Sequence, residues 1–309
     1  MKTLRLVLVI MLSSVACAPQ LKRVEAPSGV SVEFWREPTG RDDLYFGVGG
    51  QNSAPDPNTT YTLLKRDESG FSTTMDVRDG HGKKWSAKIG PEATTEVIAS
   101  RIVWAMGYPQ PPSYHVFKLP VKNGDEVKDE GPARLRPDVE WLDNRGVWKW
   151  AQNPFVGTEP YRGLIVLMMI INSTDLKDDN NTLYFARREG PRQTLWYTVK
   201  DLGATFGETG RFSPKRGDIE SFEKHPFVKK VEGQFVEFAF KGRHQELLHG
   251  IRVSDVQWTC RRLQRLTDAQ LADAFRAGGF APETASRFVR RIREKVKEGL
   301  ALEAQRKAS

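Results

Sequence analysis

The spacing of apolar residues predicts a strand-rich first part of the chain and a helical last part. Residues 71–77 and 84–89 alternate apolar and polar side chains around a polar turn at 78–82, which is typical of a β-hairpin. In the second strand, one face carries Trp85, Ala87 and Ile89, and the other carries Lys84, Ser86 and Lys88. One face of this hairpin is therefore expected to be buried, while the other carries charge.

A helix is predicted directly after this hairpin. Pro91 stands where the helix begins, and apolar residues then recur at helical spacing as far as Met106. A second helix, residues 164–171, is apolar on every side, which is typical of a helix that is buried all round. Two short strands follow it, at 182–185 and 194–199, and predict a second hairpin.

Three helices are predicted at the C-terminal end, over residues 253–266, 268–277 and 282–304. Thr267 is a typical N-cap for the second of them, and Gly278-Gly279 separates it from the third. The third helix is rich in cations, namely Arg287, Arg290, Arg291, Arg293, Lys295 and Lys297. We expect these side chains to form a solvated face.

The N-terminus has the pattern of a secretory signal. Lys2 and Arg5 flank the start of an apolar run over residues 6–12, which is shorter than the about 20 residues that span a bilayer. Ser14-Val15-Ala16-Cys17 resembles the lipobox of bacterial lipoproteins, in which the cysteine is acylated and becomes the first mature residue. The sequence therefore predicts an exported protein of the cell envelope, held to a membrane by a lipid on Cys17. Cleavage without a lipid is the alternative.

Cysteine content and charge agree with export. A lipidated Cys17 leaves Cys260 without a thiol partner, and a disulfide between the two is expected only if lipidation fails. The chain has 47 basic and 39 acidic residues, and removal of residues 1–16 takes away Lys2 and Arg5, so the mature charge is +6. This modest excess does not predict nucleic-acid binding.

The strongest chemical signal is a pair of polar stretches around the second predicted hairpin. Asp175-Leu176-Lys177-Asp178-Asp179-Asn180 follows the buried helix, and Asp201-Leu202-Gly203 begins 21 residues after Asn180. Phosphoryl transfer needs one carboxylate at the acceptor hydroxyl and an Asn/Asp pair on Mg²⁺, which this spacing provides. An ordinary polar turn is the alternative, because Asp and Asn favour turns.

These residue types predict a set of roles. Asp175 would orient the acceptor hydroxyl or accept its proton, and Lys177 would neutralise the transferred phosphoryl group. Asn180 and Asp201 would supply oxygen ligands to Mg²⁺, with donor phosphates completing its shell. The sequence does not separate Asn180 from its neighbour Asn181 as the ligand.

A phosphate-binding ion pair is predicted at the first hairpin. A lysine at the end of a strand, followed by a helix with two glutamates one turn apart, is what such a pair requires. We choose Lys88, fixed by Glu96, as the contact to the phosphates of ATP, with Lys84 and Glu92 as the alternative. Two solvated charges beside a helix are the plainer interpretation.

Other signals are weaker. Phe46-Gly47-Val48-Gly49-Gly50 lacks a flanking strand pattern and a Lys-Ser/Thr ending, so we expect an ordinary loop rather than a phosphate cradle. The five histidines lack paired metal-ligand spacing, and neither a zinc motif nor a Ser-His-Asp arrangement is predicted.

Together the motifs resemble atypical kinases rather than ordinary eukaryotic-type protein kinases. No His-Arg precedes Asp175, and Lys88 and Glu96 are only eight residues apart. The chain is similar to HipA-like kinases, whose loop has the form Asn-x-Asp-x-x-x-x-Asn, and to the secreted CotH-like kinases. It also resembles bacterial secreted proteins with Trp-x-x-Lys, Asp-Leu-Lys and Asp-Leu-Gly-Ala-x-Phe-Gly signatures.

The resemblance implies a two-lobed, α+β, atypical protein-kinase-like fold with ATP and Mg²⁺ as cofactors. We expect a signal peptide at 1–16, a tether at 17–30, a strand-rich N-lobe at 31–120, and a helical C-lobe at 121–309 that contains the catalytic-loop hairpin. The implied function is phosphotransfer to a protein or small-molecule acceptor. A catalytically silent pseudokinase and a lipoprotein scaffold are the alternatives. The expected partners include a membrane, through lipidated Cys17, and do not include nucleic acid.

Overall fold

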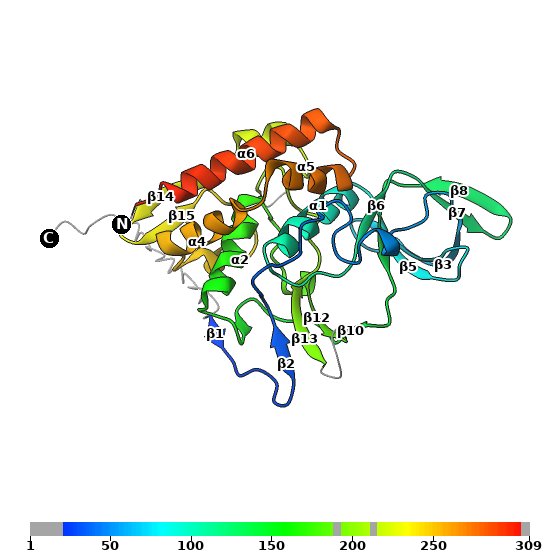
Figure 1. Ribbon diagram of the computed structural model, residues 1–309, viewed down its shortest axis with the longest axis horizontal. Helices are drawn as coiled ribbons and strands as arrows, with labels where there is room; N and C mark the ends of the chain where they lie inside the picture. Colours follow the sequence, from blue (N-terminus) through cyan, green and yellow to red (C-terminus); the bar gives the residue numbers. More distant parts are fainter. Residues whose placement is uncertain (1–20, 188–192, 211–214, 304–309) are drawn as a thin grey trace, which may run out of the picture.

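The protein forms two lobes in the computed structural model, which describes residues 21–187, 193–210 and 215–303 (Figure 1). The predicted signal peptide at 1–16 and the predicted lipidation site Cys17 lie outside the described residues. Within the described ranges, no helix has both the length and the apolar character needed to cross a bilayer.

The N-terminal lobe is built on a seven-stranded sheet with the order β6-β9-β5-β4-β3-β7-β8. Its strands are β3 (Tyr61–Asp67), β4 (Thr73–Arg78), β5 (Lys84–Ile89), β6 (Tyr114–Val116), β7 (Leu119–Asn123), β8 (Glu126–Glu130) and β9 (Ala133–Pro137). The first predicted hairpin is β4–β5, and its apolar face buries Val77, Trp85 and Ala87.

This sheet continues to Pro137, so the strand-rich lobe extends past residue 120, where the sequence placed the boundary. The reason is that β8 is charged and largely exposed, and therefore shows no apolar alternation. The following strand, β9, is different because all of its side chains are buried, including those of Arg134 and Arg136.

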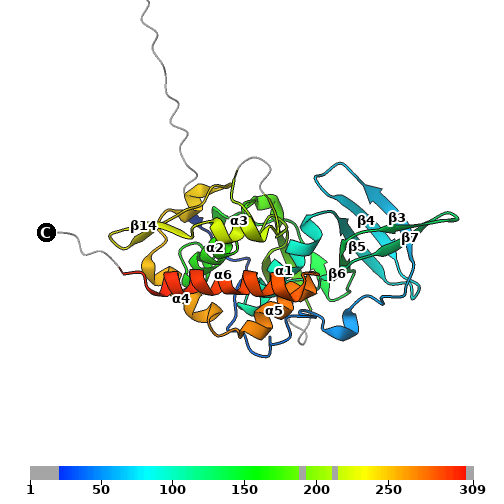
Figure 2. The same ribbon diagram turned by 90° about the horizontal axis from the view of Figure 1, so that it is seen from above.

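Helix α1 (Glu92–Ala105) lies between the two lobes and is almost entirely buried. On one side it packs against β5, β6 and β9, and on the other against α5 (Asp268–Ala277). Figures 1 and 2 both show the seven-stranded sheet at one end of the molecule, the C-terminal helices at the other, and α1 between them. A residue at the start of α1 is therefore placed to contact both lobes.

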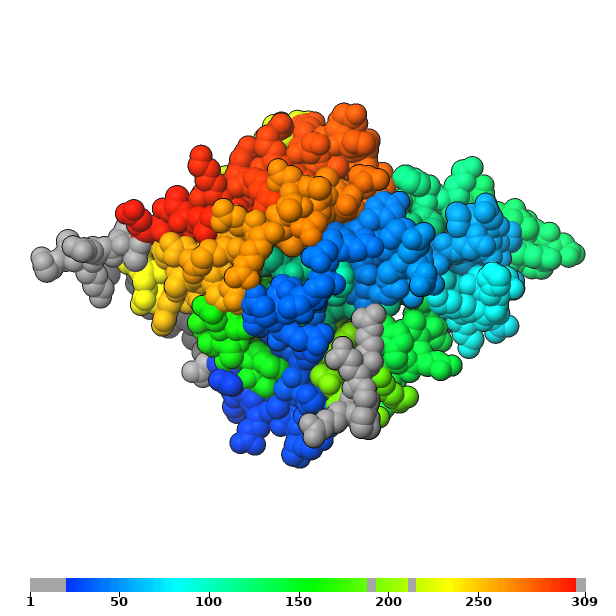
Figure 3. Space-filling view, in the orientation of Figure 1, coloured from blue at the N-terminus to red at the C-terminus, as the bar shows by residue number. Residues whose placement is uncertain are grey.

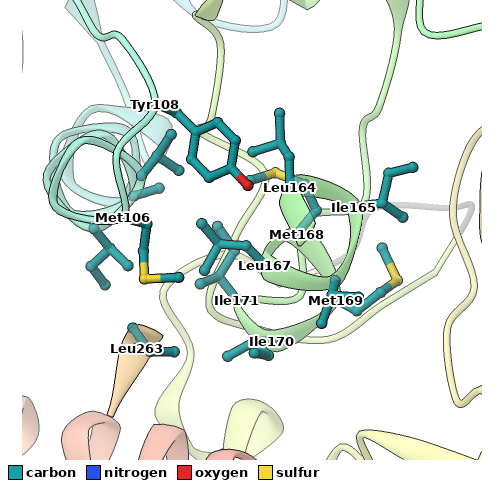
Figure 4. Packing of buried hydrophobic residues seen from close by; sticks show 14 of the residues in the cluster. Met106, Tyr108, Leu164, Ile165, Leu167, Met168, Met169, Ile170, Ile171 and Leu263 are labelled. Carbon is teal, nitrogen blue, oxygen red and sulfur yellow. The ribbon is translucent and has the colours of Figure 1, made fainter. Parts of the chain in front are cut away.

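The C-terminal lobe is organised around helix α2 (Glu159–Ile170), whose buried side chains surround it on every side, as the apolar pattern predicts (Figure 4). Thr158 caps its N-terminus by accepting a hydrogen bond from the Tyr161 amide. Helices α4 (Val253–Leu263), α5 and α6 (Pro282–Leu300) agree with the three predicted C-terminal helices, whereas the short helix α3 (Ile219–Lys224) was not predicted. A helix held this firmly fixes the loop that follows it.

A four-stranded sheet carries the second predicted hairpin. Its order is β10-β12-β13-β2, formed by β10 (Leu142–Asn144), β12 (Asn181–Ala186), β13 (Thr194–Val199) and β2 (Ser31–Glu33). A separate hairpin joins β14 (Val228–Glu232) to β15 (Phe235–Phe238), and three 3₁₀ turns occupy Gln51–Ser53, Asp178–Asn180 and Gln245–Leu248.

Part of the expected tether lies against the body of the protein. β1 (Lys22–Arg23) pairs in parallel with β11 (Gln152–Asn153), and β2 then joins the four-stranded sheet. The space-filling view shows this N-terminal segment in dark blue on the surface, at the lower part of the view (Figure 3).

Candidate functional site

Lys88 lies at the centre of a cluster of charges where the two lobes meet. Its Nζ is 2.8 Å from Glu92 Oε2, 3.0 Å from Glu96 Oε2, and 3.0 Å from both carboxylate oxygens of Asp201. Lysine, glutamates and aspartate come from β5, α1 and the segment after β13. The structure thus brings together two predicted motifs that are 113 residues apart in sequence.

The local geometry follows from the sequence. Strand alternation places Lys88 on the face of β5 opposite Trp85, and Gly90 then turns the chain into α1. Glu92 and Glu96 lie one helical turn apart and both reach the lysine. The predicted pair of Lys88 with Glu96 therefore forms, whereas Lys84, the alternative lysine, is exposed.

Glu96 is the most strongly held member of the cluster. Its carboxylate also accepts a hydrogen bond from Arg136 Nη2 at 2.6 Å and lies 2.9 Å from Arg134 Nε, and the residue is 1 % exposed. Burial alone raises the pKa of Glu96, but the charges of Arg134, Arg136 and Lys88 outweigh it and lower the pKa to about 2. The pKa of Lys88 is raised, because Glu96, Asp201 and Glu92 together outweigh the opposing effect of burial.

The Asp201-Leu202-Gly203 segment is fixed against α1. Leu202 is buried, and the Gly203 carbonyl accepts a 2.6 Å hydrogen bond from Thr95 Oγ1. A Cβ at Gly203 would stand 2.5 Å from the Cβ of Glu92, so glycine is required here by close packing. These contacts hold Asp201 beside Lys88.

The loop after α2 places Asp175 at the other side of the cluster. The Asp175 carboxylate lies 2.8 Å from Lys177 Nζ and 3.2 Å from Arg243 Nε. Asn180 Nδ2 donates to the Asp175 carbonyl at 2.5 Å, and the Asn180 carbonyl accepts from the Asp201 amide at 3.0 Å. The two predicted motifs are therefore tied together through the backbone of Asn180.

The structure separates the two candidate asparagines. Asn181 is 0 % exposed, and its Nδ2 donates to the Trp148 carbonyl at 3.1 Å, so it serves packing. Asn180 lines the cavity together with Asp201. Because Asn180 Nδ2 is used by Asp175, its amide oxygen is the atom left to act as a ligand.

A cavity of about 1010 Å³ joins these groups. Lys88, Asp175, Lys177, Asn180 and Asp201 all line it, while Glu96 lies behind Lys88 and is absent from its wall. One side is closed by the turn between β3 and β4, and the opposite side by the segment from Gly242 to Glu246. Six predicted site residues thus meet at one place, five on the wall of the cavity and one in support.

Several residues of this site were missed in the sequence. Arg134 and Arg136 arrive from β9, Arg243 from the segment after β15, and Arg216 Nε lies 3.1 Å from Glu92 Oε1. Isolated arginines carry no motif, so no sequence signal identifies them. The turn at Gly70 and Phe71 could have been predicted, because a glycine there separates β3 from β4, the two strands before the one that carries Lys88.

The glycine-rich segment at residues 46–50 does not line the cavity. An added Cβ at Gly47 would stand 2.4 Å from the Arg101 side chain, so this glycine allows close packing on α1. The preferred interpretation of this segment as a loop without phosphate contacts is therefore consistent with the structure.

Lys295 corrects the interpretation of the last helix as a solvated basic face. It is 0 % exposed, and its Nζ donates at 2.8 Å to the Ile170 carbonyl and at 2.8 Å to Asn172 Oδ1. Asn172 has a positive φ of 53°, at the start of the loop that carries Asp175. The lysine therefore holds the end of α2 through two buried hydrogen bonds, while burial lowers the pKa of its amine well below the ordinary value.

The side-chain oxygens of this site can hold Mg²⁺ only together with further oxygen ligands from a phosphate or from water. Among residues 21–187, 193–210 and 215–303, no group of three or more His, Cys, Asp or Glu side chains could hold a metal ion. Asn180 and Asp201 offer two oxygen ligands at adjacent positions, and Mg²⁺ commonly takes one or two protein ligands with phosphates and waters. The residues present therefore suit a Mg²⁺ ion that arrives with a phosphate.

The strand-rich lobe, the helical lobe and the cluster between them define a two-lobed α+β fold of the kinase-like type. The lysine strand, the helix with its paired glutamate, the Asp/Asn loop, the hairpin and Asp-Leu-Gly follow one another in the order of a kinase site.

No family model matches the chain, and no curated protein matches it. Among solved structures, a proinflammatory kinase CtkA from Helicobacter pylori matches with a TM-score of 0.42 and 10 % identity, over 73 % of this chain and 90 % of that chain. The Rio2 kinase from Chaetomium thermophilum, in an ADP/Mg²⁺-phosphoaspartate complex, matches with a TM-score of 0.34 and 14 % identity, over 77 % and 72 %. Both scores are low, so the fold assignment rests on the element order and the contacts around Lys88.

Proposed function

We propose that the protein is an exported, lipid-anchored phosphotransferase that moves the terminal phosphoryl group of a Mg²⁺-bound triphosphate such as ATP to a hydroxyl acceptor. The observation that carries this proposal is the convergence of Lys88, Asp175, Asn180 and Asp201 on one cavity, with Glu96 fixing the lysine from behind. Positioning and electrostatics are what phosphoryl transfer requires of a protein.

The donor phosphates would meet Lys88. Its ammonium is shared by three carboxylates, of which Glu92 and Glu96 are themselves neutralised by arginines. Asp201 has the most exposed carboxylate of the three, at 42 %. A donor phosphate would therefore replace Asp201 as a partner of Lys88, and Asp201 would then be free to bind the metal together with Asn180. Glu96 would keep the lysine in place. The bound Mg²⁺ would supply charge neutralisation for the donor phosphates.

The acceptor hydroxyl would meet Asp175. Each carboxylate oxygen has one cationic partner, Lys177 at Oδ2 and Arg243 at Oδ1, and keeps a lone pair that could accept the hydroxyl proton. Arg243 is the more exposed partner, with 65 % of its side chain exposed against 38 % for Lys177. Lys177 would remain beside the carboxylate, close enough to the transferred group to neutralise its charge.

A purified full chain in mild detergent tests this proposal with radiolabelled ATP and Mg²⁺. Asp175→Asn is expected to lower the phosphotransfer rate by about 10²–10⁴-fold while nucleotide binding is retained. Asp143→Asn is the matched control, because Asp143 is a β10 aspartate with an Arg145 partner at 2.6 Å and does not line the cavity. Absence of both nucleotide binding and phosphotransfer in the wild type would exclude the proposed activity.

A silent pseudokinase is the second candidate, and one observation favours it. The Lys88 ammonium has three donors and three carboxylate partners, so a phosphate that contacts it has to break an existing ion pair. The same experiment separates the two functions. Mg²⁺-dependent binding of ATP without any transfer would assign the pseudokinase.

The proposed location has its own test. Incorporation of labelled palmitate into the wild type, its loss in Cys17→Ser, and recovery of the wild type in the membrane fraction would support a lipid anchor. Release of a soluble, unlabelled wild-type protein from the cell would contradict it.

A further inference from the structure

A second, smaller cavity of about 300 Å³ opens from the same charge cluster. Lys88, Asn180 and Asp201 line both cavities, whereas Asp175 lines only the larger one. If the acceptor approaches from the side of Asp175, the transferred phosphoryl group lies at the junction. The non-transferred part of the donor then occupies the smaller cavity.

The inner wall of the smaller cavity is cationic. It is formed by Lys88, Arg134, Arg136 and Lys200, and the two arginines are only 5 % and 8 % exposed. Asp201 lies on the same wall, and Glu92 and Glu96 contact Lys88 from outside it, so four cations and three carboxylates meet here. The other charged lining residues, Lys65, Asp67, Asp76 and Asp179, are exposed at the mouth.

Lys200 differs from the other three cations because its ammonium makes no ion pair among the described residues. Within the same residues the ammonium also makes no hydrogen bond, although the Lys200 backbone is held by Asn180 and Arg136. Lys200 is partly buried and lines the cavity beside the buried guanidinium groups of Arg134 and Arg136. An anionic ligand would form charge-assisted contacts with this group of cations.

An apolar slot for a nucleobase is missing from this wall. Met75 is the one apolar side chain among the residues described around the smaller cavity, and the rest are charged or hydroxyl-bearing. Ligand pockets for aromatic groups are lined mainly by apolar and aromatic side chains. A purine placed here would cover cations without neutralising them.

We propose that the natural donor is an inorganic oligophosphate, triphosphate or a longer polyphosphate, whose non-transferred phosphates lie against Lys200, Arg134 and Arg136. This inference rests on the proposed phosphotransfer function and names its donor class. In the reaction, the acceptor oxygen forms a bond to the terminal phosphorus, and the bond between that phosphorus and the bridging oxygen breaks. The electron pair of that bond leaves with the shortened phosphate chain, which is diphosphate when triphosphate is the donor, and the hydroxyl proton passes to Asp175.

Calorimetric titration of the full chain in detergent and Mg²⁺ tests the donor class with three ligands. We expect inorganic triphosphate to bind with a Kd no higher than that of ATP, and adenosine to displace neither. Tighter binding of ATP than of triphosphate, or displacement by adenosine, would overturn the donor class and leave the phosphotransferase proposal standing. Absence of binding by either phosphate compound would overturn both.

Variants of Lys200 test whether its ammonium contacts the phosphate chain. Lys200→Met is expected to raise the Kd for triphosphate about tenfold or more, because a charge-assisted contact is lost, and Lys200→Arg is expected to restore binding. Lys84→Met, on the exposed end of β5, is the matched control and should bind as the wild type does. Near-UV circular dichroism checks that each variant folds. Equal affinities of folded Lys200→Met and Lys84→Met would contradict the assigned contact.

Discussion

Glu96→Gln removes the charge that organises the site without changing the size of the side chain. In the wild type, three cations surround this carboxylate, Lys88 at 3.0 Å, Arg134 at 2.9 Å and Arg136 at 2.6 Å. A neutral amide leaves these buried cations with one anionic partner fewer. Loss of one partner from a buried ion pair typically costs about 3–5 kcal/mol of folding free energy.

The pKa of Glu96 gives an independent magnitude. A fall from 4.5 to about 2 on folding corresponds to about 3 kcal/mol at neutral pH. The group is buried, so solvent screening does not reduce this figure. Both arguments predict that Glu96→Gln lowers the free energy of unfolding at pH 7 by about 3 kcal/mol.

The predicted loss depends on pH with a definite sign. Because the folded-state pKa of Glu96 is depressed, its contribution is present above pH 4.5 and is lost as the pH falls towards 2. At pH 3 about 1.4 kcal/mol of it should remain. The stability difference between wild type and Glu96→Gln should therefore shrink by more than half between pH 7 and pH 3.

Urea unfolding of both proteins at pH 7, 5, 4 and 3, followed by tryptophan fluorescence, measures this difference. The matched control is Glu237→Gln, because Glu237 has Lys229 at 2.6 Å and Lys230 at 3.2 Å but is 43 % exposed. Exposed pairs contribute about 0–1 kcal/mol, so the control should remain close to the wild type. A loss below 1 kcal/mol for Glu96→Gln at pH 7, or a difference that does not decrease in acid, would refute the reasoning.

Three further predictions concern the supports of the site. Lys295→Met should destabilise the fold by about 2 kcal/mol in urea unfolding and slow phosphotransfer, because Asn172 and the end of α2 lose a buried donor. Gly203→Ala should cost about 1–3 kcal/mol in the same assay, since the new Cβ would stand 2.5 Å from Glu92 Cβ. Burial raises the pKa of Cys260 to about 12, so a disulfide reagent at pH 8 should react with the folded protein at least about a hundredfold more slowly than with the unfolded protein.

The Lys295 and Gly203 variants each have a control in the chain, and the unfolded protein is the reference for Cys260. Lys297→Met changes an exposed lysine on the same helix, and Gly210→Ala adds a Cβ with nothing within 4 Å, so both should match the wild type. Rapid thiol modification of the native protein, or equal stabilities of each variant and its control, would contradict the described packing.

The site was partly visible in the sequence because some of its parts are local. Strand alternation oriented Lys88, and helical spacing brought Glu96 to the same side one turn into α1. The apolar run of α2 required a buried helix, and the loop after it therefore had to start from a fixed point. These arguments depend only on neighbours along the chain.

Local sequence patterns do not place Arg134 and Arg136 beside Glu96. Arg134 is the register partner of Lys88, and Arg136 is the register partner of Ser86, so the pairing of β5 with β9 places both guanidinium groups at the glutamate. A slip of one residue in that pairing would turn them to the opposite face. Lys88 and Arg134 are 46 residues apart in sequence, and the register between their strands is set by the packing of the whole lobe rather than by either strand.

The sequence by itself thus determined the secondary structure near the motifs, the Lys88–Glu96 pair, and the position of the loop with Asp175 and Asn180 after a buried helix. Only the tertiary structure decided that Glu92 shares the lysine, that Asn180 rather than Asn181 lines the cavity, and that Lys295 is buried. The physical reason is that local periodicity orients a side chain within its own element. Which distant charges meet it depends on strand register and helix packing, and these distant charges set the pKa values at the site.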